Sequence, residues 1–143
     1  RYGVMHRNTY LNSPGLLDRY YRLIADDRIS FAGQMTGVEG YVESAASGFL
    51  AGVETARRLL GQEPIDFPQE TAIGALGLYV SSESIGNFQP MNVNFGIIPP
   101  LDHRVKGKRN KNAELSRRSL EIIDGLRESV LDGVKEESHE DHH

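Results

Sequence analysis

Apolar residues between positions 42 and 60 recur every three or four residues, which is the spacing of one face of a helix. The charges of Arg57 and Arg58 suit the last turn of such a helix, and Gly61 suits the residue that follows it. We therefore predict a helix that ends near Gly61. Its apolar face would comprise Val42, Ala46, Phe49, Leu50, Val53, Ala56 and Leu60.

The pattern predicts two further helices. The second would begin near Pro68, whose fixed backbone angle suits a first turn that also holds Glu70, and would end between residues 81 and 86. Asn112 would cap the third helix. The apolar positions of these two helices are Ile73, Leu76 and Val80, followed by Leu115, Ile122, Ile123, Leu126 and Val130.

The remaining segments favour extended or irregular structure. Residues 3–11, 20–24 and 29–32 predict short strands, and the run Asn12-Ser13-Pro14-Gly15 predicts a turn after the first of them. Residues 87–101 contain three Asn and three Pro without a sustained period, which predicts an ordered loop. The polar residues 137–143 predict a disordered tail.

Composition narrows the class of protein. The 143 residues, 38% of them hydrophobic and 25% charged, are enough for one compact domain. With a formal net charge of -4, any contact with nucleic acid would come from a local basic patch. We expect a cytoplasmic protein without membrane contact, because no apolar run could span a bilayer and no secretion signal is recognised. The absence of Cys excludes disulfides, thiolate metal sites and a cysteine nucleophile, and no metal site is expected.

The most informative segment is FAGQMTGVEGYVESAASG, residues 31–48. A short apolar strand would lead into a loop with Gly33, Gly37 and Gly40, and a helix would begin near Tyr41. Glycines let a ligand approach the backbone, and the free N–H groups of a first helical turn favour an anion. The same pattern also suits a tight turn before a helix whose small residues only permit close packing.

This segment resembles the flavin-contacting segment of the TrmFO family, which are flavin- and folate-dependent tRNA uracil methyltransferases. The segments GVMHRNTYL, FPQETAIGAL and NFQPMNVNFGIIPPL are also similar to that family, so the resemblance covers residues 1–101. A sibling family that installs carboxymethylaminomethyl groups on wobble uridines shares the layout GQxxGxxGYxExAxxG, where x is any residue. The run His6-Arg7-Asn8-Thr9, the pair Val38-Glu39 and the Asn-rich loop favour the folate-dependent family.

The resemblance implies an enzyme that forms ribothymidine in the T-loop of tRNA. Methylenetetrahydrofolate would supply the carbon, and FAD, reduced by NADH or NADPH, would supply the reducing equivalents. Two alternatives stay open. One is the sibling wobble-uridine family, and the other is a non-catalytic module that binds tRNA or protein without flavin.

The resemblance also assigns cofactor contacts. Tyr41 would form an aromatic wall against the flavin or pterin, unless it is a core tyrosine. Glu43 would anchor a ribityl hydroxyl or only complement the helix dipole. His6 would stack on the pterin ring, unless it is a structural histidine. The full FAD set is Gly33, Gln34, Thr36, Gly37, Gly40, Tyr41 and Glu43, and the folate set is His6, Arg7 and Asn8.

Five positive charges fall within eight residues and are not interrupted by an acid. Such a run suits a phosphate-binding surface for tRNA, because phosphate contacts require charge density and little geometry. It also suits a solvated, flexible basic loop. The residues are Arg104, Lys106, Lys108, Arg109 and Lys111.

The implied fold is α/β: the edge of a Rossmann-like FAD-binding domain with part of an inserted substrate domain, then about three helices. Residues 1–28 would belong to the substrate or folate domain, 29–61 to the FAD-binding domain, and 62–136 to a C-terminal helical region.

Parts that the family needs are not found in this sequence. It contains neither the G-x-G-x-x-G loop nor the catalytic cysteines, and it begins at Arg1. We therefore expect a C-terminal fragment with an incomplete fold, no catalytic residue and no activity alone. Its partners would be tRNA, folate and the missing N-terminal part of the same protein, and exposed apolar surface would favour self-association.

Overall fold

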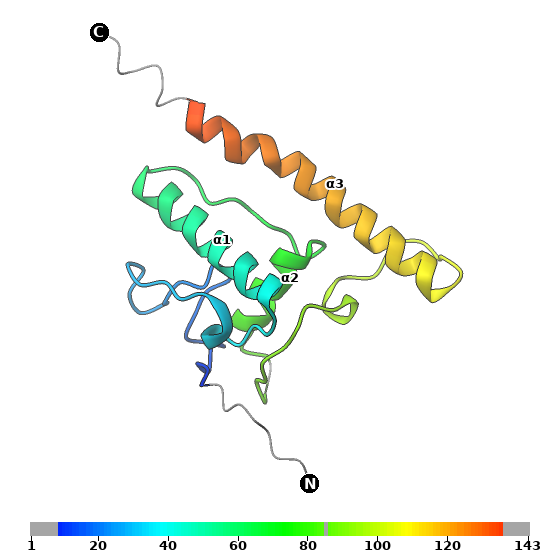
Figure 1. The fold of residues 1–143 in the computed structure, drawn as a ribbon, viewed down its shortest axis with the longest axis horizontal. Coiled ribbons are helices and arrows are strands. Elements are labelled where there is room, and N and C mark those ends of the chain that lie inside the picture. Colours follow the sequence, from blue (N-terminus) through cyan, green and yellow to red (C-terminus); the bar gives the residue numbers. More distant parts are fainter. Residues whose placement is uncertain (1–8, 85, 136–143) are drawn as a thin grey trace.

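A computed structural model describes residues 9–84 and 86–135, and these residues form three α-helices and two short 3-10 helices (Figure 1). The helices are α1 (Tyr41–Leu59), α2 (Ala72–Ser81) and α3 (Lys108–Lys135), and the 3-10 helices are η1 (Gly33–Thr36) and η2 (Phe95–Ile97). No helix in this described part of the chain is long and apolar enough to cross a membrane.

Helix α1 lies where the apolar period predicts it. At its end, Gly61 adopts a left-handed backbone with φ 68°, and the N–H of Gln62 donates to the carbonyl of Arg57 at 2.8 Å. The predicted buried face is wrong in part, because Val42, Phe49, Ala56 and Leu60 are exposed. The residues that α1 buries are Ser47, Leu50, Ala51 and Glu54. Apolar residues on more than one side of α1 explain the error, because they offer two candidate faces.

Helices α2 and α3 begin at residues other than the predicted ones. Thr71 caps α2, its hydroxyl accepting a hydrogen bond from the N–H of Gly74 at 3.0 Å, so Pro68 and Glu70 precede the helix. Helix α3 begins four residues before the predicted cap. Gly107, with φ 86°, redirects the chain there, and Asn112 lies inside the helix.

The predicted strands, and with them an α/β sheet, are wrong for the described residues, which form only isolated bridges. Leu17 pairs with Leu23, and Arg22 with Ser30. Tyr21 has φ 63°, and Asp18 accepts hydrogen bonds from the N–H groups of Tyr20 and Arg22. This local turn interrupts the extended run, and no neighbouring strands prolong the pairing. Residues 3–8 lie outside the described residues.

One hydrophobic core joins the helices to the segments between them. Helices α1 and α2 pack against each other, and Gly77 of α2 lies near Leu50 of α1. Gly77 also leaves room for the carbonyl of Arg19, which a Cβ would overlap. Helix α3 runs along the outside of the molecule (Figure 1) and packs Ile123, Leu126 and Val130 against this core. The core residues are Tyr21, Val38, Leu50, Ala51, Ile65, Phe67, Leu76, Val80 and Phe88.

Candidate functional site

Three glycines with left-handed backbone shape the loop before α1. Gly33 has φ 75° at the start of η1, Gly37 has φ 94° at its end, and Gly40 has φ 96° immediately before α1. Residues with a Cβ rarely adopt this conformation. The spacing of the glycines therefore follows from the turns of the loop, whether or not a ligand approaches it.

Buried hydroxyls hold the loop from beneath. The hydroxyl of Ser47 accepts from the N–H of Gly33 at 2.7 Å, and Thr36 donates its hydroxyl to the carbonyl of Gly33 at 2.7 Å. Ser13 donates to the carbonyl of Thr36 at 2.6 Å. Thr36 is fully buried, so its side chain supports the loop and does not face outward.

The Asn-rich segment lies directly beside this loop, which sequence spacing alone does not reveal. The N–H of Met91 donates to the carbonyl of Gly37, and the N–H of Glu39 donates to the carbonyl of Met91, both at 3.0 Å. The side-chain amide of Asn92 donates to the carbonyl of Glu39 at 3.0 Å. One oxygen of Glu43 accepts from the N–H of Val93 at 3.1 Å, so this carboxylate helps to fasten the two segments together.

Phe88 provides a second reason, besides the backbone angle, why position 37 requires glycine. A Cβ at Gly37 would overlap the Phe88 ring, which is buried and also contacts the rings of Tyr10 and Tyr79. Sequence reasoning missed the role of Phe88, because an isolated Phe in an irregular loop offers no periodic signal.

The outward side of the loop presents an aromatic ring and an open helix end. Tyr41 is 97% exposed, which contradicts its assignment as a core tyrosine, and Gln34 and Gly40 are also exposed. The N-cap residue of α1 is Gly40, which has no side chain to cap the first N–H groups, and the carboxylate of Glu43 lies beside it. An uncapped helix N-terminus beside exposed backbone is able to bind an anionic or polar group.

Of the two other predicted sites, only the basic run lies within the described residues. His6, Arg7 and Asn8 lie outside the described residues. The five basic residues of positions 104–111 are all exposed, and Figure 1 shows the start of α3 well away from η1.

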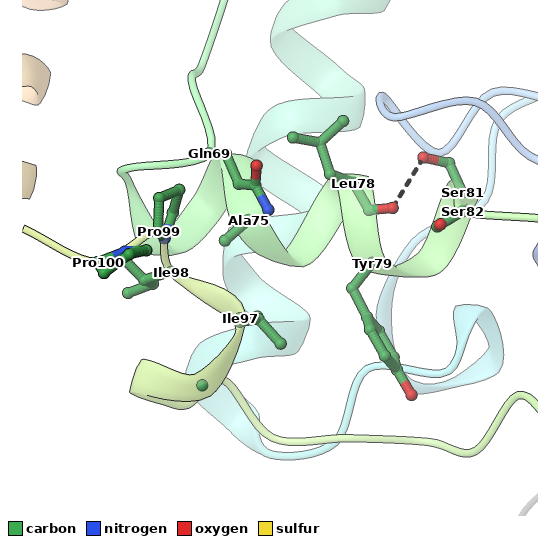
Figure 2. A pocket seen from close by; sticks show the side chains of 11 residues that line it. Gln69, Ala75, Leu78, Tyr79, Ser81, Ser82, Ile97, Ile98, Pro99 and Pro100 are labelled. Atoms are coloured by element: carbon green, nitrogen blue, oxygen red, sulfur yellow. Dashed lines mark hydrogen bonds between the residues drawn. The ribbon is translucent and has the colours of Figure 1, made fainter. Parts of the chain in front are cut away.

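A cavity of about 560 Å³ lies between α2 and the segment after η2, and Figure 2 shows its lining. None of the predicted cofactor residues lines it, and its lining has no charged side chain. Tyr79 donates its hydroxyl to the carbonyl of Gln89, and Ser81 donates to the carbonyl of Leu78. Two polar groups of the cavity lining therefore already have partners within the protein. This cavity therefore lacks the convergent polar groups of a specific ligand site.

Known proteins resemble this chain over nearly its whole length. The family described as Glucose inhibited division protein A matches residues 1–63, which include the glycine loop and all of α1. A relative from Staphylococcus haemolyticus is 51% identical over 131 residues, and one from Acetivibrio thermocellus is 57% identical over 123 residues. Both are named methylenetetrahydrofolate–tRNA-(uracil-5-)-methyltransferase TrmFO. The chain belongs to the TrmFO family.

This membership favours the folate-dependent family over the wobble-uridine sibling, because the relatives' names specify a folate donor and carbon 5 of uracil. The matches cover 91% and 86% of this chain but only 30% and 28% of those two relatives. The chain thus spans about 30% of the length of these TrmFO proteins.

Proposed function

We propose that this chain provides the flavin-contacting loop of a TrmFO enzyme that forms ribothymidine in the T-loop of tRNA. The observation that supports this most directly is the conformation of the loop. Three left-handed glycines leave the N-terminus of α1 uncapped and Tyr41 exposed, within a segment that matches a flavoprotein-like family.

The exposed features of the loop fit FAD. Gly33 and Gly40 would let the flavin approach the backbone, Gln34 would hydrogen-bond a ribityl hydroxyl, and Tyr41 would flank a ring. The N-terminus of α1 would stabilise negative charge on the reduced flavin by a few tenths to about 2 kcal/mol. When bound, reduced FAD supplies the reducing equivalents for the methyl group.

Two of the predicted FAD residues would act indirectly. Thr36 is buried and hydrogen-bonded to Gly33, and Glu43 is bonded to Val93. We assign both to positioning the loop, with Glu43 also adding negative charge that complements the dipole of α1.

The remaining ligand contacts are proposals that follow from family membership. His6, Arg7 and Asn8 would bind methylenetetrahydrofolate, and NADH or NADPH would reduce the flavin. The exposed basic residues Arg104, Lys106, Lys108, Arg109 and Lys111 would contact phosphates of tRNA.

The three segments predicted to belong to different domains contribute to one hydrophobic core. Tyr21 of residues 1–28, Leu50 of residues 29–61 and Leu76 of residues 62–136 belong to the same core cluster. We therefore propose that these three segments contribute to different ligand sites while folding as a single body.

The outward face of α1 would be covered by the part of the TrmFO chain outside the matched region. Val42 is 78% exposed and Leu59 is 77% exposed, at opposite ends of a stripe that also contains Ala45, Phe49, Gly52 and Ala56. A stripe this apolar is typical of a buried interface. The covering part would also provide the catalytic residues, so we propose that this chain has no methyltransferase activity alone.

A chimera tests the proposed function. This chain would replace the matched region of the Staphylococcus haemolyticus relative, and FAD content and methylenetetrahydrofolate-dependent tRNA methylation would be measured. We expect the chimera to retain both bound FAD and tRNA methylation. Tyr41→Ala should weaken FAD retention by roughly 3- to 10-fold through loss of ring contact. Ile24→Ala removes an exposed apolar side chain from another loop and should have no such effect.

The alternatives give different results. A folded chimera that binds tRNA but no flavin would favour the non-catalytic module. Formation of a carboxymethylaminomethyl uridine in place of ribothymidine would favour the sibling family.

A further inference from the structure

A small cavity lies beside the turn that leads into α3, apart from the glycine loop. Its volume is about 160 Å³, and its lining combines three apolar residues with three basic ones. The apolar side consists of Pro100, Leu101 and Val105, and the basic side of His103, Arg104 and Lys111. Only two of the five residues in the basic run therefore line the cavity.

Of the three basic side chains that line this cavity, His103 is the one that pairs with an acid among the described residues. Among the described residues, neither Arg104 nor Lys111 forms a salt bridge. The nearest acid in sequence, Asp102, bonds instead to the imidazole of His103, with 2.6 Å between Oδ1 and Nδ1. This hydrogen bond and the charge of His103 lower the pKa of the Asp102 carboxyl. The acid thus orients the histidine and leaves the two strong cations available.

The backbone around the cavity is held at both ends. Arg118 of α3 donates to the carbonyls of Pro99 and Pro100, the latter at 3.0 Å. Asn110 donates its side-chain amide to the carbonyl of Lys106 at 3.1 Å, and Gly107 allows the sharp turn between them. A preorganised cationic cavity loses less entropy on binding than a flexible basic loop does.

The size of the cavity limits its ligand. Pockets for nucleotides, flavins and drug-sized molecules measure roughly 300–1,000 Å³, so this one is too small for a ring system with its substituents. A tetrahedral oxyanion fits, and Arg and Lys donors form strong charge-assisted hydrogen bonds to phosphate oxygens. An apolar ligand would leave the charged side chains of this cavity without partners.

We propose that this cavity binds a single phosphate group, with Arg104 and Lys111 as its donors and His103 at its edge. The source of the phosphate would be the backbone of the tRNA, which rests on the proposed function. A free phosphate ion presents the same chemistry, so the two sources are separated experimentally.

The first arm uses sodium phosphate, with sodium chloride at equal ionic strength as the reference. We expect saturable NMR shifts confined to residues 100–111 of the intact chain. Arg104→Gln and Lys111→Gln should each weaken this binding by roughly 10-fold, since each removes a charged donor. Arg127→Gln removes the same charge from an exposed position farther along α3, outside the cavity and the basic run, and should change phosphate binding by less than about twofold. Non-saturable shifts over all exposed Lys and Arg residues, or equal effects of the three variants, would overturn the proposal.

The second arm uses a T-arm RNA hairpin in a salt titration. If the cavity binds an RNA phosphate, Arg104→Gln and Lys111→Gln should lower the salt dependence by about one phosphate contact, and inorganic phosphate should compete. Saturable phosphate binding without RNA competition would show a free-ion site and remove the RNA source. If Gln substitutions at each of the five basic residues of positions 104–111 weaken RNA binding equally, the result would support the diffuse tRNA surface of the proposed function and reject the cavity.

Discussion

Glu54 shows at the scale of one residue how burial and hydrogen bonding compete. This side chain of α1 is only 9% exposed, and one of its oxygens accepts from the N–H of Ile65 at 2.9 Å. Burial raises the pKa of the Glu54 carboxyl, against the hydrogen bond from Ile65 and the charges of Arg57, Arg22 and Arg19. The carboxylate thus joins α1 to the segment before α2 at a cost in solvation.

This shift predicts a pH dependence of the free energy of unfolding. Because the folded pKa of Glu54 lies above its unfolded value, its stabilising contribution is complete below the unfolded pKa and is lost as pH rises through the folded pKa. Glu54→Gln keeps an oxygen that can accept from Ile65 but does not titrate. We expect the unfolding free energy of the native chain, minus that of the variant, to fall as pH rises above the unfolded pKa of Glu, about 4.3.

Urea denaturation across this range measures the difference. Glu63→Gln, at an exposed position, serves as the matched control and should give a flatter difference. A difference for Glu54→Gln that stays constant or increases with pH would show that burial does not control this carboxyl.

At the scale of elements, the attachment of α3 to the rest of the protein depends on side chains distributed along the helix. Leu115 in its first half is buried, and Ile123, Leu126 and Val130 pack against the core farther along. Arg57 of α1 donates to the carbonyl of Ser129, and Arg118 holds the Pro99-Pro100 segment. A helix of 28 residues with few close backbone neighbours therefore stays attached through a narrow apolar stripe.

Leu115→Ala tests this attachment. Leu115 is 2% exposed, so its truncation should destabilise the protein by roughly 2–5 kcal/mol, near the lower end because a cavity already adjoins it. Leu120→Ala changes a residue on the same helix that is 65% exposed and should cost less than about 0.5 kcal/mol. Thermal unfolding, with amide exchange of α3, measures both. Equal effects of the two variants would contradict the packing described.

At the scale of the whole molecule, the outward stripe on α1 is the most conspicuous surface. A monomeric protein rarely leaves such a long apolar stripe uncovered. Relatives about three times as long as this chain provide the additional residues that would cover it.

Phe49→Asp tests this surface, because a charge in the centre of the stripe should oppose its burial. We expect the native chain to co-purify with the remaining part of the Staphylococcus haemolyticus relative, and the variant to co-purify roughly 10-fold less. Leu120→Asp places the same charge on an exposed position of α3 and should behave like the native chain.

Sedimentation of the chain alone completes this test. A dimer that Phe49→Asp dissociates, without any association with the relative, would identify a second copy as the partner. Co-purification of Phe49→Asp at the native level would exclude the stripe as the interface.

Sequence by itself determined the local features of this protein. The period of apolar residues located α1 because i, i+3 and i+4 side chains share a helix face, and the glycines located the loop because only glycine readily adopts its backbone angles. The motif in residues 31–48 also led to the TrmFO family, which the relatives confirm. These features depend on residues close together in the chain.

Tertiary structure decided what depends on distant residues. Which face of α1 is buried, why Glu43 bonds to Val93, and why Phe88 lies over Gly37 all follow from contacts between residues distant in the sequence, which no local period encodes. The last two contacts each span about 50 residues. The predicted strands failed for the same reason, because a strand requires hydrogen-bonding neighbours and the described residues provide only isolated bridges. The small cavity likewise combines residues before and within α3, which the turn at Gly107 and the hydrogen bond from Arg118 to Pro100 hold together.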